Sequence, residues 1–389
     1  MMKLFFKFIP AVLIFISVSI FLSSYINQSD KVSFPRFPYK QAGLTERQAA
    51  AHLLSRFTYG ATPGQVDEVV KTGLEKWFRQ QLSGKLKDDS LNRRLMKYDA
   101  LNLSNKEVLN IYPKRGQLVK MAVKDGIINK DSISVADKKE YKDQITAYMK
   151  QKGYKPQQEL FRQFINQKIL RASYTNNQTQ EILTDFWFNH FNVSITKNQC
   201  AEFIPAYERD VIRPSVVGKF NDLLIATAKS PAMLYYLDNF SSSGANTNLP
   251  VGNKKIAERM QTAMQDSASQ KGKLIKKLQQ VKKNQGLNEN YAREVMELHT
   301  LGVDGGYTQQ DVTEAAKILT GWTVFPMGDN AYGNAIQKII DQAGEGTLEK
   351  RGFVHDGDFI FVPNRHNNQE KIFLGKKFNA NGGYQEGID

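Results

Sequence analysis

Apolar residues recur every three or four positions over most of the chain, which is the spacing of amphipathic helices. Thr45 followed by Gln48 forms a capping-box pattern that predicts a helix ending near Phe57. Pro63 occupies the first position of another predicted helix. A longer predicted helix, over residues 157–173, carries a broad apolar stripe made of Leu160, Phe161, Phe164, Ile165, Ile169 and Leu170. The chain is therefore expected to be mostly helical from residue 45 onward.

The spacing of apolar residues changes from the helical period to strict alternation only near the C-terminus. Residues 359–362 and 372–374 are short apolar stretches, and the polar residues 364–369 separate them. This arrangement predicts a β-hairpin with a long turn. No internal repeat of the length found in solenoid proteins is visible. The expected fold is all-α, with orthogonal or bundled helices and a minor C-terminal β-hairpin.

The first 26 residues have the pattern of an export signal. A short basic segment, MMKLFFK, precedes the largely apolar residues 8–25. This segment is either a cleaved signal peptide or an uncleaved inner-membrane anchor, because the apolar run approaches the length that spans a bilayer. Both alternatives place the rest of the chain outside the cytosol, in the periplasm or at the cell surface. Residues 27–44 are expected to be a linker before a single helical domain over residues 45–389.

The charge balance favours an anionic partner. The 389 residues include 53 Lys and Arg against 39 Asp and Glu, a formal net charge of +14. Half of this excess lies in a basic insertion, residues 241–285, where residues 254–283 hold nine Lys or Arg and two carboxylates. The insertion is either a solvated segment or a patch for an acidic surface polymer. Nucleic acid is not expected as the partner, because the chain is exported and aromatic residues do not alternate with the basic ones.

Two carboxylates stand out on a predicted helix over residues 288–299. Asn290, Glu294 and Glu297 fall within one 60° sector beside an apolar stripe. That placement suits a general acid/base pair or ligands of a divalent cation. Alternatively, Arg293 and Glu297 form an ion pair one turn apart and Glu294 caps a neighbouring helix. A lone cysteine, Cys200, excludes an intrachain disulfide and a zinc knuckle, so the identity of any metal is left open.

His190 lies one helical turn from Trp187 among bulky aromatic residues. A buried imidazole there must form a hydrogen bond. It is either a base or metal ligand opposite Glu294, or a core histidine bonded to backbone or to Asp238. Asp238 is in turn either a third ligand or a loop residue.

The sequence contains five distinctive segments. The longest is NENYAREVMELHTLGVDGGYTQQDVTEAAKILTGWT at residues 288–323. The others are AHLLSRFTYGATP (51–63), LTDFWFNHF (183–191), SPAMLYYLDN (230–239) and RHNNQEKIFLG (365–375). In order and spacing they resemble the bacterial domain-of-unknown-function family 1800 over about residues 45–389.

The resemblance implies a mostly helical, exported protein and no particular reaction. Genes of that family often lie beside genes of sulfatase-like exported proteins, which implies a partner of that kind. The matched positions are Trp187, Asn189, His190, Asp238, Asn239, Asn290, Tyr291, Arg293, Glu294, Glu297, Gly302, Gly306, Tyr307, Gly321 and Trp322. The basic insertion looks longer than is usual in the family, and the family pattern continues into further helices after residue 389. We therefore expect this chain to be C-terminally truncated.

Two hypotheses of function follow, and the sequence leaves open whether the chain is an enzyme. The first is an extracytoplasmic hydrolase that acts on cell-surface material. Its catalytic residues would be Glu294, Glu297, His190 and Arg293, and its substrate-binding residues would be Trp187, Asn189, Asp238, Asn290 and Tyr291. The second is a non-catalytic binding or assembly module that works with the sulfatase-like partner, in which the same residues form a buried polar network.

Overall fold

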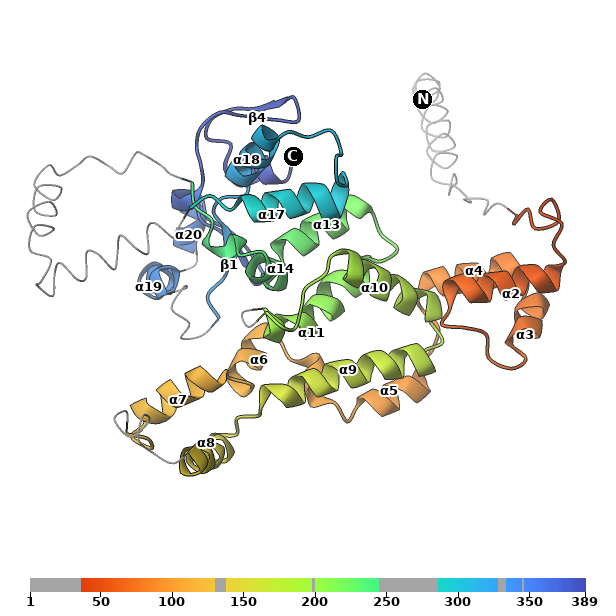
Figure 1. The fold of residues 1–389 in the computed structure, drawn as a ribbon, viewed down its shortest axis with the longest axis horizontal. Helices are drawn as coiled ribbons and strands as arrows, with labels where there is room; N and C mark the ends of the chain where they lie inside the picture. The colour runs from red at the N-terminus through yellow and green to blue at the C-terminus, as the bar shows by residue number, and fades with distance from the viewer. Residues whose placement is uncertain (1–35, 130–137, 198–199, 245–285, 328–333, 345) are drawn as a thin grey trace, which may run out of the picture. The chain divides into compact units, whose positions relative to one another are not determined.

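The computed structural model describes residues 36–129, 138–197, 200–244, 286–327, 334–344 and 346–389 (Figure 1). These residues divide into two compact units, one within residues 1–56 and 60–80 and the other formed by residues 57–59 and 81–389. Helices dominate both units, which confirms the predicted mostly α-helical fold with a small C-terminal group of strands. The predicted signal or anchor and nearly all of the basic insertion lie outside the described residues.

The first unit carries α2 (Glu46–Phe57), α3 (Gln65–Thr72) and most of α4 (Leu74–Ser83). The predicted capping box at the start of α2 is confirmed. The Thr45 backbone N–H donates to Gln48 Oε1 at 2.8 Å, and the Gln48 N–H donates to Thr45 Oγ1 at 3.3 Å. The predicted start of the next helix at Pro63 was wrong by two residues, because α3 begins at Gln65, after Gly64 in the left-handed conformation.

The second unit consists mainly of helices. Its α-helices are α5 (Asp89–Leu95), α6 (Asn105–Ile111), α7 (Arg115–Lys124), α8 (Lys138–Lys152), α9 (Gln157–Tyr174), α10 (Gln178–His190), α11 (Ile204–Ala206), α12 (Arg213–Ser215), α13 (Phe220–Lys229), α14 (Pro231–Tyr236), α17 (Glu289–Glu294), α18 (Gln309–Ile318), α19 (Asn334–Ala343) and α20 (Gly346–Lys350). Short 3₁₀ turns join several of them, namely η2 (Asp99–Asn102), η4 (Ala201–Phe203), η6 (Asn239–Ser241), η8 (Pro363–Arg365) and η9 (Gly383–Gly387). Two segments are π-helical, η5 (Tyr207–Ile212) and η7 (Val295–Thr300). Figure 1 shows α5 alongside α9, and residues of the two helices are in contact.

Apolar side chains from several helices form the largest core of this unit. Four side chains are buried together there, Phe191 directly after α10, Tyr207 of η5, Leu223 of α13 and Met233 of α14. Burial of such side chains is the main stabilising term in folding. This core fixes η5 between α10 and α13, and η5 therefore positions the charged residues described below.

The C-terminal strands pair differently from the predicted hairpin. Strand β3 (Phe359–Phe361) pairs with β1 (Trp322–Val324) and β2 (Val354–Asp356), whereas β4 (Lys371–Phe373) pairs with β5 (Lys376–Phe378). The two predicted strands therefore lie in separate antiparallel sheets. The physical reason is that each forms its own tight hairpin. Both turns have two residues and positive φ angles, Gly357 (58°) in one, Leu374 (47°) and Gly375 (76°) in the other.

No helix within the described residues combines the length and the apolarity that crossing a bilayer requires.

Candidate functional site

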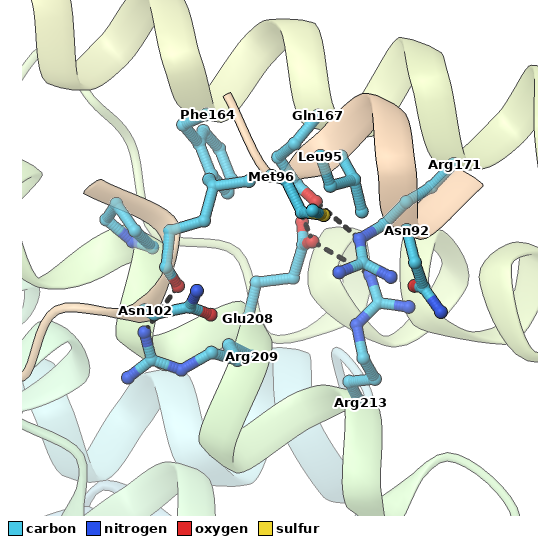
Figure 2. Close-up of a pocket in the computed structure, with 12 residues that line it drawn as sticks. Asn92, Leu95, Met96, Asn102, Phe164, Gln167, Arg171, Glu208, Arg209 and Arg213 are labelled. Atoms are coloured by element: carbon cyan, nitrogen blue, oxygen red, sulfur yellow. Dashed lines mark hydrogen bonds and ion pairs between the residues drawn. The ribbon is translucent and has the colours of Figure 1, made fainter. Parts of the chain in front are cut away.

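A pocket with a volume of about 270 Å³ opens beside α9 and the π-helix η5 (Figure 2). Its lining residues are Asn92, Leu95, Met96, Leu101, Asn102, Phe164, Gln167, Arg171, Pro205, Glu208, Arg209 and Arg213. Three arginines and one carboxylate give this lining a formal charge of +2. We call this cavity the arginine pocket.

Helix α9 turns its polar stripe toward the protein interior. Gln163, Gln167 and Arg171 are four residues apart and share one face, and both glutamines are buried. The predicted apolar stripe was wrong in part, because Ile165 and Ile169 lie on the opposite face and are 48% and 59% exposed. Buried amides are tolerated there because they are hydrogen-bonded, and Gln167 Nε2 donates to Glu208 Oε1 at 2.9 Å.

The π-helix η5 carries Glu208 and Arg209 to the pocket. It lies between α11, which contains Pro205, and α12, which contains Pro214. A proline has no N–H and cannot extend the ordinary α-helical ladder, which favours a wider turn here. The i to i+5 repeat of a π-turn places Glu208 over Arg213, and Arg213 Nη2 donates to Glu208 Oε1 at 3.1 Å.

Glu208 is the centre of a buried ion cluster. It is 2% exposed, and its Oε2 also accepts a hydrogen bond from Lys168 Nζ at 2.7 Å. Burial alone would raise the pKa of Glu208, but the charges of Lys168 and Arg213 outweigh burial and lower it. Lys168 and Arg213 extend the cluster to Asp185 and Glu181, respectively. This carboxylate is therefore ionised and fully hydrogen-bonded at neutral pH.

Arg171 is less completely paired than its neighbours. Its Nε donates to Gln167 Oε1 at 2.6 Å, but Nη1 lies 3.8 Å from Glu181 Oε1, which is too long for a hydrogen bond. No acceptor for Nη1 or Nη2 occurs among the described residues. Burial, and then the charge of Arg213, lower the pKa of Arg171. Figure 2 shows the guanidinium groups of Arg171 and Arg213 beside one another, close to the amide of Asn92.

Arg209 has a structural role in the wall of the pocket. Its Nε and Nη2 donate to the carboxylate of Asp210, and its Nη1 donates to the carbonyl oxygens of Leu101 and Leu103 at 2.6 and 3.0 Å. These bonds hold the C-terminal end of η2 and the residue that follows it against η5. Arg171 and Arg213 are therefore the two arginines that can present N–H groups to a ligand.

The structure places the predicted His190 at the end of α10, against the π-helix η7. Its Nε2 lies 3.0 Å from the carbonyl oxygen of His299, so Nε2 carries the proton. Its ring also packs beside the rings of Phe191 and Phe220. Of the two sequence alternatives for His190, the geometry matches the histidine bonded to backbone. The buried His299 has its pKa lowered to about 4, first by burial and then by the charge of His190.

The predicted carboxylates lie on α17 and η7. Burial, followed by the negative charge of Glu297, raises the pKa of Glu294. Glu297 forms a hydrogen bond with the hydroxyl of Tyr307, and Arg293 Nη2 donates to Gln309 Oε1 on α18 at 2.6 Å. The observed partner of Arg293 is therefore an amide.

The remaining predicted residues are dispersed. Asn290 is exposed, whereas Tyr291 is fully buried and donates its hydroxyl proton to the Ala228 carbonyl at 2.9 Å. Trp187 packs on Phe191, and Asn189 Nδ2 donates to the Asp185 carbonyl at 2.8 Å. Asp238 is exposed and pairs with Lys197 at 2.7 Å.

The structure thus brings two of the predicted segments together: the end of α10, which carries His190, lies against η7, which carries Glu297. None of the nine predicted residues lines the arginine pocket. No group of three or more His, Cys, Asp and Glu side chains is placed to hold a metal ion within the ranges that the structure describes. The roles assigned to these residues, and the divalent cation, stay predictions.

We expect the substitution Glu294→Gln to raise the melting temperature slightly at pH 7. The raised pKa of Glu294 means that its contribution to stability is present below the unfolded-state pKa and is lost as the pH rises through the folded-state pKa. Glutamine removes this penalty, so the difference from wild type should vanish near pH 3. Differential scanning calorimetry at both pH values measures this difference in melting temperature. A melting temperature that falls at pH 7 would contradict this account of Glu294.

Sequence reasoning did not identify the arginine pocket. One signal was present, the spacing of Gln163, Gln167 and Arg171 by four residues along a helix with apolar residues elsewhere.

Comparisons with known proteins give one match. The family model described as "Protein of unknown function (DUF1800)" matches residues 52–389. No curated protein and no solved structure matches the chain.

Proposed function

The chain belongs to the DUF1800 family of proteins of unknown function, and we propose from its own residues that it is a binding module for an anionic ligand. The arginine pocket is the proposed binding site. One observation carries the proposal: the guanidinium groups of Arg171 and Arg213 lie side by side at the pocket, and the terminal N–H groups of Arg171 have no described acceptor (Figure 2).

Guanidinium groups suit carboxylate, sulfate and phosphate ligands. Their planar N–H groups match the oxygen atoms of these anions in pairs, and such charge-assisted hydrogen bonds are stronger than neutral ones. An anion beside Arg171 would also offset the repulsion between Arg171 and Arg213, which now contributes to the lowered pKa of Arg171. The amides of Asn92 and Asn102 add neutral hydrogen-bonding groups to the same pocket.

The pocket is suited to binding more than to chemistry. Glu208 is the carboxylate in its lining, and it already accepts hydrogen bonds from Gln167, Lys168 and Arg213. It is therefore not free to act as a general base. A volume of about 270 Å³ lies near the lower limit for ligand pockets, which run from roughly 300 to 1,000 Å³. The pocket would hold one anionic group or one residue of a polymer.

The proposed ligand class agrees with the expected location. If residues 1–26 export the chain, an acidic surface polymer is an accessible source of carboxylate or sulfate groups. Assembly with a sulfatase-like exported partner is a further proposal that rests on the family resemblance. The hydrolase hypothesis depends on Glu294, Glu297 and His190, and these residues lie outside this pocket.

Arg171→Gln tests the proposal. We expect sulfate, phosphate or glucuronate to bind the wild-type chain saturably at low ionic strength in isothermal titration calorimetry. Arg171→Gln should weaken the binding of the preferred anion about tenfold or more, because a hydrogen bond to a charged group is lost inside a pocket. The matched control is Arg162→Gln on the same helix, since Arg162 is exposed and pairs with Glu159. Equal affinity in both variants would contradict the proposal, as would the absence of saturable binding to wild type.

A further inference from the structure

The arginine pocket also has an apolar part, which the binding of a simple anion would not use. Five of its lining residues are apolar, namely Leu95, Met96, Leu101, Phe164 and Pro205. Leu95 and Leu101 are partly buried and Met96 is 77% exposed, so some of this apolar surface is open to solvent. A ligand that covers such surface gains affinity, because apolar area is removed from water. We call these five residues the apolar half of the pocket.

Helix α9 separates the apolar half from the arginines along its axis. Phe164, Gln167 and Arg171 are three and four residues apart, so they share one face of α9, and all three line the pocket. Two helical turns, about 10 Å, separate Phe164 from Arg171. The guanidinium group of Arg171 therefore lies at one end of this face and the ring of Phe164 at the other (Figure 2).

Helix α5 runs antiparallel to α9 along the pocket. Just before α5, Asp88 Oδ2 accepts a hydrogen bond from Thr175 Oγ1 at 2.7 Å. After α5, Asp99 Oδ1 accepts one from Gln163 Nε2 at 2.9 Å. The start of α5 therefore faces the C-terminal end of α9, and the end of α5 faces its middle.

The side chains of α5 and of the residue that follows it repeat the order found on α9. Asn92 lies at the Arg171 end of the pocket, whereas Leu95 and Met96 come about one turn later, toward Phe164 (Figure 2). The polar residues of the two segments therefore face one another at one end of the pocket, and their apolar residues face one another at the other.

The wall opposite α9 has the same direction. Pro205 precedes the π-helix η5 and Arg213 follows it. Arg213 lies beside Arg171, which places Pro205 toward the other end of the pocket (Figure 2). The charge of Arg209 is offset by its pair with Asp210. Three segments therefore run from a polar to an apolar residue in the same direction.

We infer that the ligand of the arginine pocket is an organic anion that carries an apolar chain. The anionic group would bind Arg171 and Arg213, and the chain would lie along Leu95 and Met96 toward Phe164. A methionine at the rim suits this role, because its unbranched thioether adapts to different shapes. The inference rests on the proposed function and narrows its ligand class. The hydroxyl groups of a sugar acid would lose water at the apolar half without gaining hydrogen bonds.

The test compares two six-carbon carboxylates in isothermal titration calorimetry with the full chain. Hexanoate has an apolar chain, and gluconate has the same chain with a hydroxyl group on each carbon after the carboxylate. We expect hexanoate to bind about tenfold or more tightly than gluconate. Affinity should also rise about two- to fourfold for each methylene group added from acetate through butyrate to hexanoate. Hexyl sulfate has a chain of the same kind on a sulfate, and the tighter of hexyl sulfate and hexanoate identifies the preferred anionic group.

Met96→Gln locates the chain in the pocket. Glutamine is nearly as long as methionine but polar, so the ratio of hexanoate affinity to gluconate affinity should fall about threefold or more. The matched control is Ile169→Gln, because Ile169 is 59% exposed on the opposite face of α9 and does not line the pocket. This control should keep the wild-type ratio. Arg171→Gln should weaken both ligands by similar factors, since both carry the carboxylate.

The outcomes separate this inference from the proposed function. If gluconate binds as tightly as hexanoate and Arg171→Gln weakens both, this inference is overturned and the proposed function stands. Equal ratios in Met96→Gln and Ile169→Gln would also overturn the inference. If no anion binds saturably, the proposed function fails and the inference fails with it.

Discussion

Replacement of Glu208 by glutamine is expected to lower the free energy of unfolding by about 3 to 5 kcal/mol, because it leaves buried cations without their counter-ion. Glu208 is 2% exposed and is the shared partner of Lys168 and Arg213. Glutamine has nearly the same shape, so the change isolates the charge. Urea denaturation followed by tryptophan fluorescence measures the effect.

The pH dependence gives this prediction a second readout. The folded-state pKa of Glu208 is lowered, so its stabilising contribution is present above the unfolded-state pKa of about 4.3 and is lost as the pH falls through the folded-state pKa. The difference between wild type and Glu208→Gln should therefore shrink in acid. The control is Asp210→Asn, two residues away, whose half-exposed pair with Arg209 should contribute about 1 kcal/mol or less. Similar losses in both variants would contradict the account.

The second large effect is expected at Glu386, in the C-terminal strand region. Lys371 is 1% exposed, and its Nζ lies 2.6 Å from Glu386 Oε2. Glu386→Gln would leave this buried lysine with the Gln369 carbonyl, 2.9 Å from Nζ, as a neutral acceptor. We expect a loss of about 3 to 5 kcal/mol in the free energy of unfolding, measured by urea denaturation.

A double variant separates the cost of an unpaired charge from general damage to packing. Lys371→Met combined with Glu386→Gln removes both charges and should recover much of the stability lost in Glu386→Gln. The exposed pair between Glu370 and Lys377 is the matched control, and Glu370→Gln should cost about 1 kcal/mol or less. If the double variant is no more stable than Glu386→Gln, the unpaired lysine is not the cause.

The elements that could be predicted are those fixed by neighbouring residues. The capping box of Thr45 and Gln48 is local, and the sequence alone located the start of α2. The pairing of β3 with Trp322 depends on residues far along the chain, and the sequence could not supply it. Gly357 was a local signal of a short turn, and the prediction of one hairpin with a long turn did not use it.

The arginine pocket could not be predicted for two physical reasons. First, the face of α9 that is buried is decided by the partners of Gln163 and Gln167, and one of these partners, Glu208, comes from a distant segment. Second, the pairing of Glu208 with Arg213 requires a π-turn, since five residues of an α-helix would place them about 140° apart. The acidic character of Glu294 and Glu297 was visible in the sequence, but the arginine pocket lies elsewhere.

The most direct measurement is the location of a bound anion. Crystals of the protein soaked in selenate, a sulfate analogue with anomalous scattering, would show where such an anion is held. We expect an anomalous peak within hydrogen-bond distance of the Arg171 and Arg213 guanidinium groups, and we expect this peak to be lost in Arg171→Gln. A peak that persists in Arg171→Gln, or selenate found only on surface lysines, would contradict an anion-binding role for this pocket.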